Sequence, residues 1–256
     1  MSKVDDYRHT LHTLTDWDSF LLQESGLPGP RGNLELAQAV ADAGEEALFR
    51  RYLSFDADKA PTNSPQEFLA FCGVVGLGRL LAEGRREFLA TLRSCASDPR
   101  WRTREGVAMA LQRLGDRDMD ALLLAMEAWS KGNPLEQRAA AAALCEPRLL
   151  REPEQVRRVL LVLDDITAAV GNMAERKGDA FRALRKGLGY CWSVAVVALP
   201  EEGKQRMERW LGSNDKDIRW IMRENLKKNR LVRMDTAWVA CWRSPEDDAL
   251  RQAQRP

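Results

Sequence analysis

Ser64-Pro65, Asp98-Pro99 and Asn133-Pro134 recur along the chain at intervals of 34 and 35 residues. In each pair a side-chain oxygen can accept hydrogen bonds from the free N–H groups that begin a helix, and the proline is preset for the first helical turn. A period of this length is typical of stacked helix pairs, none of which can bury its apolar face alone. The pattern predicts an all-α fold, namely a right-handed α-solenoid of about five to six helical repeats.

A second pattern, D-x-R-W-x-x-R-E-x-[VL], begins at Asp98 and again at Asp217, 119 residues later. This separation corresponds to about three or four repeats, so we expect both segments to be the same helix of different repeats. A degenerate copy lies between them, where Gln137 and Arg138 precede the apolar run 139–144. An early Asp, then Arg, then a small apolar run ending in Leu is common in the second helix of a HEAT repeat. The W-x-x-L-G-x-x-Y core of tetratricopeptide repeats is absent, so the sequence favours HEAT-like repeats.

Start and stop signals divide the chain into an acidic segment of helices at 1–58, a HEAT-like array at 59–243 and a C-terminal tail at 244–256. No stretch alternates apolar and polar residues between turns, so no sheet is expected. We expect a short helix near the C-terminal end and longer ones at 4–14, 16–25, 34–43, 45–55, 65–83, 85–96, 99–114, 118–130, 134–144, 153–170, 179–199, 201–211 and 215–229.

Composition predicts a soluble, cytoplasmic helical protein. The 256 residues are 45% hydrophobic and 30% charged, and they suffice for a sizeable core. Asp5 and Asp6 stand where the basic region of a signal peptide would be, and the most apolar run, 194–199, is too short to cross a bilayer. We therefore expect no membrane partner. The five scattered cysteines include no C-x-x-C pair and predict buried, reduced thiols.

Charge is distributed unevenly along the chain. Residues 1–58 contain five Lys or Arg against eleven Asp or Glu, although the whole chain has a net charge of +1. Between Arg219 and Arg233 there are six basic residues and one acidic residue. This asymmetry indicates an anionic partner for the C-terminal part. The alternative is that these charges are an ordinary solvated helix surface.

Neither a metal nor a cofactor is expected. The two histidines, His9 and His12, lie three residues apart on one expected helix, but a zinc site needs at least three protein ligands and no further His or Cys is near. Gly73, Gly76 and Gly78 superficially resemble a phosphate-binding loop. They fall inside a helical stretch and follow no strand, so close packing of helices is the better interpretation.

Two tryptophans lie off the apolar stripes of their expected helices, Trp101 on 99–114 and Trp220 on 215–229. An aromatic ring beside arginines can support a base or a deoxyribose while the cations contact phosphates. The alternative is structural, with each Trp packed on the neighbouring repeat and each Arg in an ion pair. The candidate binding residues are Trp101, Arg104, Arg138, Tyr190, Arg219, Trp220, Arg223 and Lys227.

At these motifs the chain resembles the bacterial alkylpurine DNA glycosylases that are built from HEAT-like repeats. Trp101 and Glu105 have the spacing of that family's aromatic and aspartate, with Glu in place of Asp, and Arg138 follows at about the distance of its arginine. The segment K-G-L-G-Y, which ends at Tyr190, is similar to the family's K-A-I-G-W. The resemblance implies a concave DNA-binding face, with Glu105 as the catalytic carboxylate, Arg138 on a phosphate, and Trp101 and Tyr190 against the sugar.

Three functions follow from these observations. Because Glu replaces the family's Asp at position 105, the leading hypothesis is a non-catalytic binding protein whose partner is anionic, either nucleic acid or an acidic protein segment. The second is a DNA glycosylase that excises alkylated purines. The third is a protein–protein scaffold, which predicts a large apolar groove with the tryptophans pointing into it.

Overall fold

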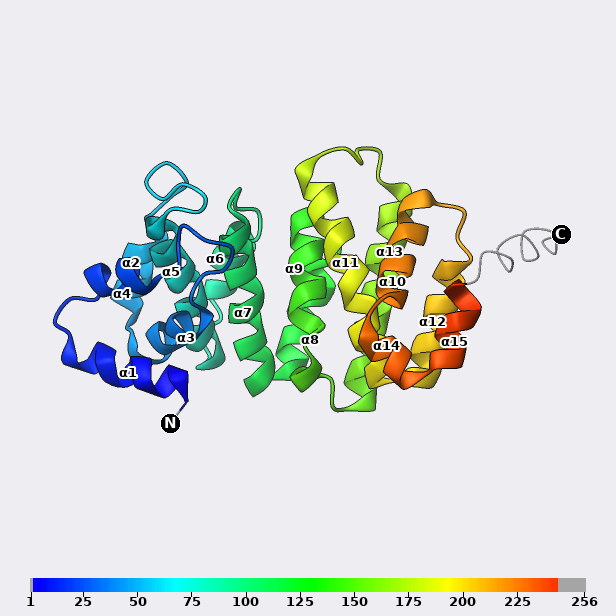
Figure 1. Cartoon of the computed structure of the whole chain (residues 1–256), viewed down its shortest axis with the longest axis horizontal. Coiled ribbons are helices and arrows are strands. Elements are labelled where there is room, and N and C mark those ends of the chain that lie inside the picture. Colours follow the sequence, from blue (N-terminus) through cyan, green and yellow to red (C-terminus); the bar gives the residue numbers. More distant parts are fainter. Residues whose placement is uncertain (1, 244–256) are drawn as a thin grey trace. The chain divides into compact units, whose positions relative to one another are not determined.

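The computed structural model describes residues 2–243, and these residues form α-helices and one 3-10 helix without any strand (Figure 1). The predicted all-α class is confirmed, whereas the right-handed solenoid of HEAT-like repeats stays a prediction. The helices group into two compact units, residues 1–122 and 123–256. The predicted division at residues 58 and 59 is not tested, and the predicted tail at 244–256 lies outside the described residues.

The first unit is built around α5, which packs against α2, α3, α4, α6 and α7, while α1 packs on α3. Because other helices surround α5, nearly all of its side chains are buried. The helices are α1 (Lys3–Thr13), α2 (Asp18–Glu24), α3 (Leu34–Ala43), α4 (Glu46–Leu53), α5 (Pro65–Ala82), α6 (Phe88–Cys95), α7 (Trp101–Arg117) and α8 (Met119–Trp129), which continues into the second unit.

Glycines allow two neighbouring helices to approach α5 closely. A Cβ atom at Gly76 would lie 2.3 Å from the Phe49 ring of α4, and one at Gly78 would lie 2.4 Å from Cα of Ala110 on α7. Such separations are far shorter than van der Waals contact, so a larger residue would force the helices apart. The glycines of this stretch therefore serve helix packing, as the sequence predicted.

Two of the three cap-proline signals begin helices as predicted. Ser64 accepts a hydrogen bond from the N–H of Glu67, and Pro65 is the first residue of α5. Asn133 accepts hydrogen bonds from two N–H groups in the first turn of α9, which begins at Pro134. In both cases the side chain compensates donors that the helix itself leaves unpaired.

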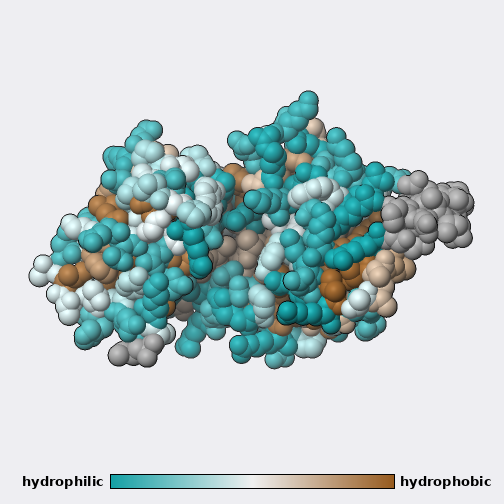
Figure 2. All heavy atoms as spheres, in the orientation of Figure 1, coloured by the Kyte–Doolittle hydropathy of each residue, from teal (hydrophilic) through white to brown (hydrophobic). Residues whose placement is uncertain are grey.

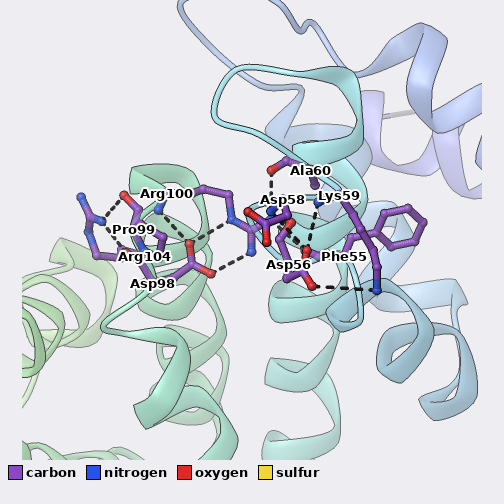
Figure 3. Close-up of polar contacts among 9 residues, drawn as sticks. All are labelled: Phe55, Asp56, Asp58, Lys59, Ala60, Asp98, Pro99, Arg100 and Arg104. Carbon is purple, nitrogen blue, oxygen red and sulfur yellow. Dashed lines mark hydrogen bonds and ion pairs between the residues drawn. The ribbon is translucent and has the colours of Figure 1, made fainter.

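The third signal does not begin a helix, because α7 starts only at Trp101. The Asp98 carboxylate instead accepts hydrogen bonds from the backbone N–H of Arg100, at 2.7 Å, and from both sides of its guanidinium, at 2.9 and 2.7 Å. The guanidinium of Arg100, which is only 4% exposed, also donates to three backbone carbonyls of the loop 55–60 (Figure 3). The residue predicted to cap α7 therefore holds a buried arginine that ties this loop to the start of the helix.

In the second unit α9, α11 and α13 lie side by side with α11 in the middle, and α10 and α12 pack against this row (Figure 1). The helix α14 packs on both α11 and α13, and α15 packs on α13 and α14. The elements are α9 (Pro134–Leu144), the 3-10 helix η1 (Pro147–Leu149), α10 (Pro153–Asn172), α11 (Asp179–Ala198), α12 (Pro200–Leu211), α13 (Lys216–Leu226), α14 (Asn229–Met234) and α15 (Thr236–Arg243).

Helix α13 ends earlier than the sequence predicts. The expected helix 215–229 stops at Leu226, and after Lys227 and Lys228 the chain starts the short helix α14 at Asn229. The stretch contains neither Gly nor Pro, so no local stop signal marks the break. Its consequence is a change of chain direction that lets α14 pack on α11 as well as on α13.

The cysteines agree with the prediction only in part. Cys72, Cys145 and Cys191 are buried, but Cys95 is half-buried and Cys241 is exposed. Burial raises the pKa of the Cys72 and Cys145 thiols well above the ordinary value, which keeps them protonated. No helix in the described range 2–243 combines the length and apolar character needed to cross a membrane.

Candidate functional site

The candidate residues fall in both units. The first group lies on α7 and the second is distributed over α9, α11 and the α13 region. The first unit contains Trp101, Arg104 and Glu105, and the second contains Arg138, Tyr190, Arg219, Trp220, Arg223 and Lys227.

In the first unit one candidate side chain is open to solvent. Trp101 is 42% exposed, and the guanidinium of Arg102 lies 4.4 Å from its ring centroid. Arg102 is itself buried and pairs with Glu67 at 3.3 Å. Arg104 donates hydrogen bonds to two backbone carbonyls in the turn before α7, and Glu105 is half-buried on the same helix. The cations next to Trp101 are therefore engaged within the protein, as the structural alternative predicts.

In the second unit, the two glycines of the K-G-L-G-Y segment receive the helices on either side of α11. A Cβ atom at Gly187 would lie 3.3 Å from Cγ of Arg138 on α9, and one at Gly189 would lie 3.3 Å from the Trp220 ring on α13. Because glycine has no side chain, Arg138 and Trp220 can pack closely against α11, the helix that carries Tyr190. The structure therefore places Arg138 and Trp220 on either side of α11, against the segment that precedes Tyr190.

Trp220 packs in the contact between α13 and α11. Its ring is half-buried beside Gly189, and the guanidinium of Arg185 lies 3.8 Å from the ring centroid. Arg185 pairs in turn with Asp217 at 2.9 Å. A ring held in this way stabilises packing and has less surface to offer a ligand, so the structural interpretation fits Trp220 best.

The two copies of the D-x-R-W pattern occupy different positions relative to the start of their helices, while their assignment to the same helix of different repeats stays a prediction. Asp98 precedes the first residue of α7 by three positions, whereas Asp217 is the second residue of α13. In consequence Arg100 is buried, while Arg219 is half-exposed and has no carboxylate within 4.0 Å among residues 2–243. A shared sequence pattern has thus produced two different environments.

Cations follow one side of α13. Arg219, Arg223 and Lys227 are spaced by four residues, which places them on the same side of the helical path. Arg223 and Lys227 are exposed, and Lys227 pairs with Glu224 at 2.5 Å. These three residues form what we call the α13 stripe, and the stripe ends next to Lys228.

A groove of about 650 Å³ lies where α14 meets α11, and we call it the Tyr190 groove. Tyr190 is 43% exposed, and its hydroxyl accepts a hydrogen bond from the guanidinium of Arg230. That guanidinium lies 4.7 Å from the ring centroid, and Nζ of Lys228 lies 5.9 Å from it. The groove is lined by Tyr190, Val197, Lys228, Asn229, Arg230, Arg233 and Met234.

The cations of the Tyr190 groove lack acidic partners. Within the described part of the chain, no carboxylate lies within 4.0 Å of the charged nitrogens of Lys228, Arg230 or Arg233. Elsewhere in the unit Arg157 and Arg158 each pair with a glutamate, at 2.8 and 2.7 Å. Uncompensated positive charge around an exposed aromatic ring attracts anions. The face seen in Figure 2 is largely hydrophilic, with smaller hydrophobic areas.

Sequence reasoning identified Tyr190 but not the three cations that surround it. The excess of basic residues up to Arg233 was the available signal, yet a continuous helix to residue 229 would distribute those residues around its circumference. The break after Leu226 is what turns Lys228 and Arg230 toward α11. The missing information was therefore the position of a helix end that no local signal marks.

Neither a group of metal ligands among the described residues nor a similar known protein indicates a function for this chain. Across the described residues no group of three or more His, Cys, Asp or Glu side chains is arranged to hold a metal ion, and His9 and His12 are both exposed. Comparisons with protein-family models, curated proteins and solved structures find no match to this chain. The resemblance to alkylpurine DNA glycosylases stays a prediction.

Proposed function

We propose that this protein is a HEAT-like repeat protein that binds nucleic acid through the Tyr190 groove and the adjoining α13 stripe, without catalysing a reaction. The observation that carries the proposal is the group of three cations without acidic partners around the exposed ring of Tyr190. Phosphates compensate such cations, and the release of counterions from the nucleic acid drives the association.

The chemistry of the groove favours nucleic acid over an acidic protein segment. Carboxylates can pair with Lys228, Arg230 and Arg233, but a carboxylate does not stack on the ring of Tyr190. A nucleotide supplies both a phosphate for the cations and a flat base or a sugar for the ring. No tryptophan lines this groove, which is one reason to rank the protein scaffold below nucleic-acid binding.

The proposal assigns no catalytic role to Glu105. This carboxylate belongs to the first unit, whereas the groove is built entirely from residues of the second. Incubation with an alkylated DNA duplex tests the point, and we expect no release of the modified base. Base release that Glu105→Gln abolishes would contradict the proposal and favour the glycosylase.

The main experiment measures binding of labelled oligonucleotides by fluorescence anisotropy at about 50 mM and about 200 mM salt. We expect affinity to fall steeply with salt. A variant with methionine at Lys228, Arg230 and Arg233 should lose about three phosphate contacts, which reduces the log–log salt slope by about 2 for single strands. The matched control places methionine at Lys131, Arg151 and Arg209, which do not line the groove.

Two results would contradict the proposal. One is the absence of binding at low salt to single-stranded and double-stranded probes alike. The other is equal loss of affinity in the groove variant and in the control, because both remove three positive charges but only one removes the groove cations. Circular dichroism and thermal unfolding of both variants verify that each remains folded.

A further inference from the structure

The lining of the Tyr190 groove combines two kinds of surface. Its cations are Lys228, Arg230 and Arg233, and its apolar members are Tyr190, Val197 and Met234. Val197 follows Tyr190 by seven residues on α11, which is two helical turns, so both side chains leave the same side of the helix. Both are exposed, at 43% and 37%. The groove therefore offers an apolar strip beside its positive charge.

The outer surface of a nucleic-acid duplex can satisfy only part of this lining. A duplex presents phosphates and sugars, while the flat faces of its bases are stacked inside. An unpaired strand exposes those faces, and every base can stack on an aromatic ring whatever its identity. The cations suit either form, but the apolar strip formed by Tyr190 and Val197 suits only the unpaired one.

The size and rigidity of the groove agree with this preference. Its volume of about 650 Å³ falls within the range of about 300–1,000 Å³ typical of sites that enclose small organic molecules. Such a space is large enough for a nucleotide. The hydrogen bond from Arg230 holds the hydroxyl end of Tyr190, so the ring is oriented before a ligand arrives, which lowers the entropic cost of binding.

We infer that the Tyr190 groove selects single-stranded nucleic acid, with one unpaired base stacked on the ring of Tyr190 and its neighbouring phosphates on Lys228, Arg230 and Arg233. The inference rests on the proposed function and adds the class of ligand. Val197 contacts the edge of the same base or of the next one along the strand. Stacking makes the site tolerant of sequence, since it reads no hydrogen-bonding edge.

The test compares three probes of equal length by anisotropy at low salt: a thymidine oligodeoxynucleotide, an abasic chain with the same phosphates, and a blunt duplex. The single strand should bind at least about 5-fold more tightly than the abasic chain, because stacking accounts for the difference. Tyr190→Ala should remove about that factor from the single strand and leave the abasic chain and the duplex within about two-fold.

Two further variants separate the ring from other causes. Tyr190→Phe retains the ring and should retain most of the affinity for the single strand. Leu161→Ala removes an exposed apolar side chain of the second unit that does not line the groove, and it should leave all three affinities unchanged. Unaltered binding of the abasic chain by Tyr190→Ala also shows that this variant keeps its fold and its cations.

The possible results distinguish the inference from the proposed function. If the single strand, the abasic chain and the duplex bind equally and Tyr190→Ala changes none of them, the inference is overturned while phosphate binding by the groove stands. A duplex that binds more tightly than the single strand has the same meaning. If no probe binds at low salt, both the inference and the proposed function are overturned.

Discussion

At the first copy of the D-x-R-W pattern Arg100 is 4% exposed and Trp101 is 42% exposed, whereas at the second copy Arg219 is half-exposed and Trp220 packs on α11. The aspartates differ as well. The first pairs with its own arginine two residues later, and the second holds two arginines from other parts of the chain, Arg176 and Arg185.

The difference arises from where each helix begins. Residues 98–100 precede α7, so a turn sets their side-chain directions, while residues 217–219 lie within α13 and follow helical geometry. With the helix start shifted by a few residues, a buried arginine and an exposed tryptophan at the first copy become two side chains of intermediate burial at the second. The lesson is that a repeated motif predicts equivalent environments only when the helix starts are aligned.

The largest expected difference between the two copies is in the stability lost when the arginine is replaced. Arg100→Met should lower the free energy of unfolding by about 2–4 kcal/mol, because it leaves the Asp98 carboxylate and three loop carbonyls without their buried donor. Arg219→Met should change it by less than about 0.5 kcal/mol, since this side chain has no carboxylate partner among residues 2–243. Urea denaturation followed by circular dichroism provides both values, and equal losses would contradict the contrast.

For the two tryptophans, we expect replacement at the second copy to cost more stability than replacement at the first. Trp220→Ala removes a ring that fills the contact between α13 and α11, so we expect a loss of about 2 kcal/mol. Trp101→Ala removes a ring with 42% exposure, and we expect a loss below about 1 kcal/mol. Thermal unfolding of the two variants under identical conditions checks the order. A greater loss at Trp101 would mean that its exposed ring contributes more packing than Trp220 does.

Asp215, which caps α13 two residues before the second copy, can be tested by pH. Burial opposes ionisation of Asp215, but hydrogen bonds from Arg176 and from the N–H groups of Ile218 and Asp217 outweigh it, so its pKa lies below the ordinary 3.8. A lowered native pKa means stability that is present above the unfolded pKa and lost as the pH falls through the native one. Asp215→Asn should therefore cost about 1 kcal/mol near neutral pH and progressively less below pH of about 4.

The check is urea denaturation of Asp215→Asn and the unaltered protein at several pH values from neutral downward. A destabilisation by Asp215→Asn that stays constant as the solution is acidified would show that the carboxylate acts only through its shape as a helix cap. Convergence of the two proteins in acid is the expected result.

The smallest effect concerns binding by Arg219. As one member of the α13 stripe it should contribute about one phosphate contact, so Arg219→Met should reduce the log–log salt slope for single-stranded DNA by about 0.7. Arg209→Met is the matched control, since that arginine pairs with Asp164 and does not line the groove. Salt titrations of both variants measure the difference. An unchanged slope in Arg219→Met would confine the interface to the Tyr190 groove.

The candidate site was predictable only where a single helix determines it. The K-G-L-G-Y segment, through the family resemblance, identified Tyr190 as a candidate binding residue, and the off-stripe position of Trp220 among basic residues identified Arg219, Arg223 and Lys227. Trp220 was also identified, but its environment proved to be a packing contact. Lys228 and Arg230 were not predicted as site residues, because their positions depend on a helix end without a local signal.

The sequence by itself determined the helical class, most helix positions, the caps at Ser64 and Asn133 and the packing role of the α5 glycines. These features depend on periodicity and on side chains within about one turn of each other. The tertiary structure decided which arginines are buried and which surround Tyr190. Arg100 reaches a carbonyl 45 residues away and Arg230 reaches a hydroxyl 40 residues away, and partners at such distances along the chain are chosen by packing, which no local pattern encodes.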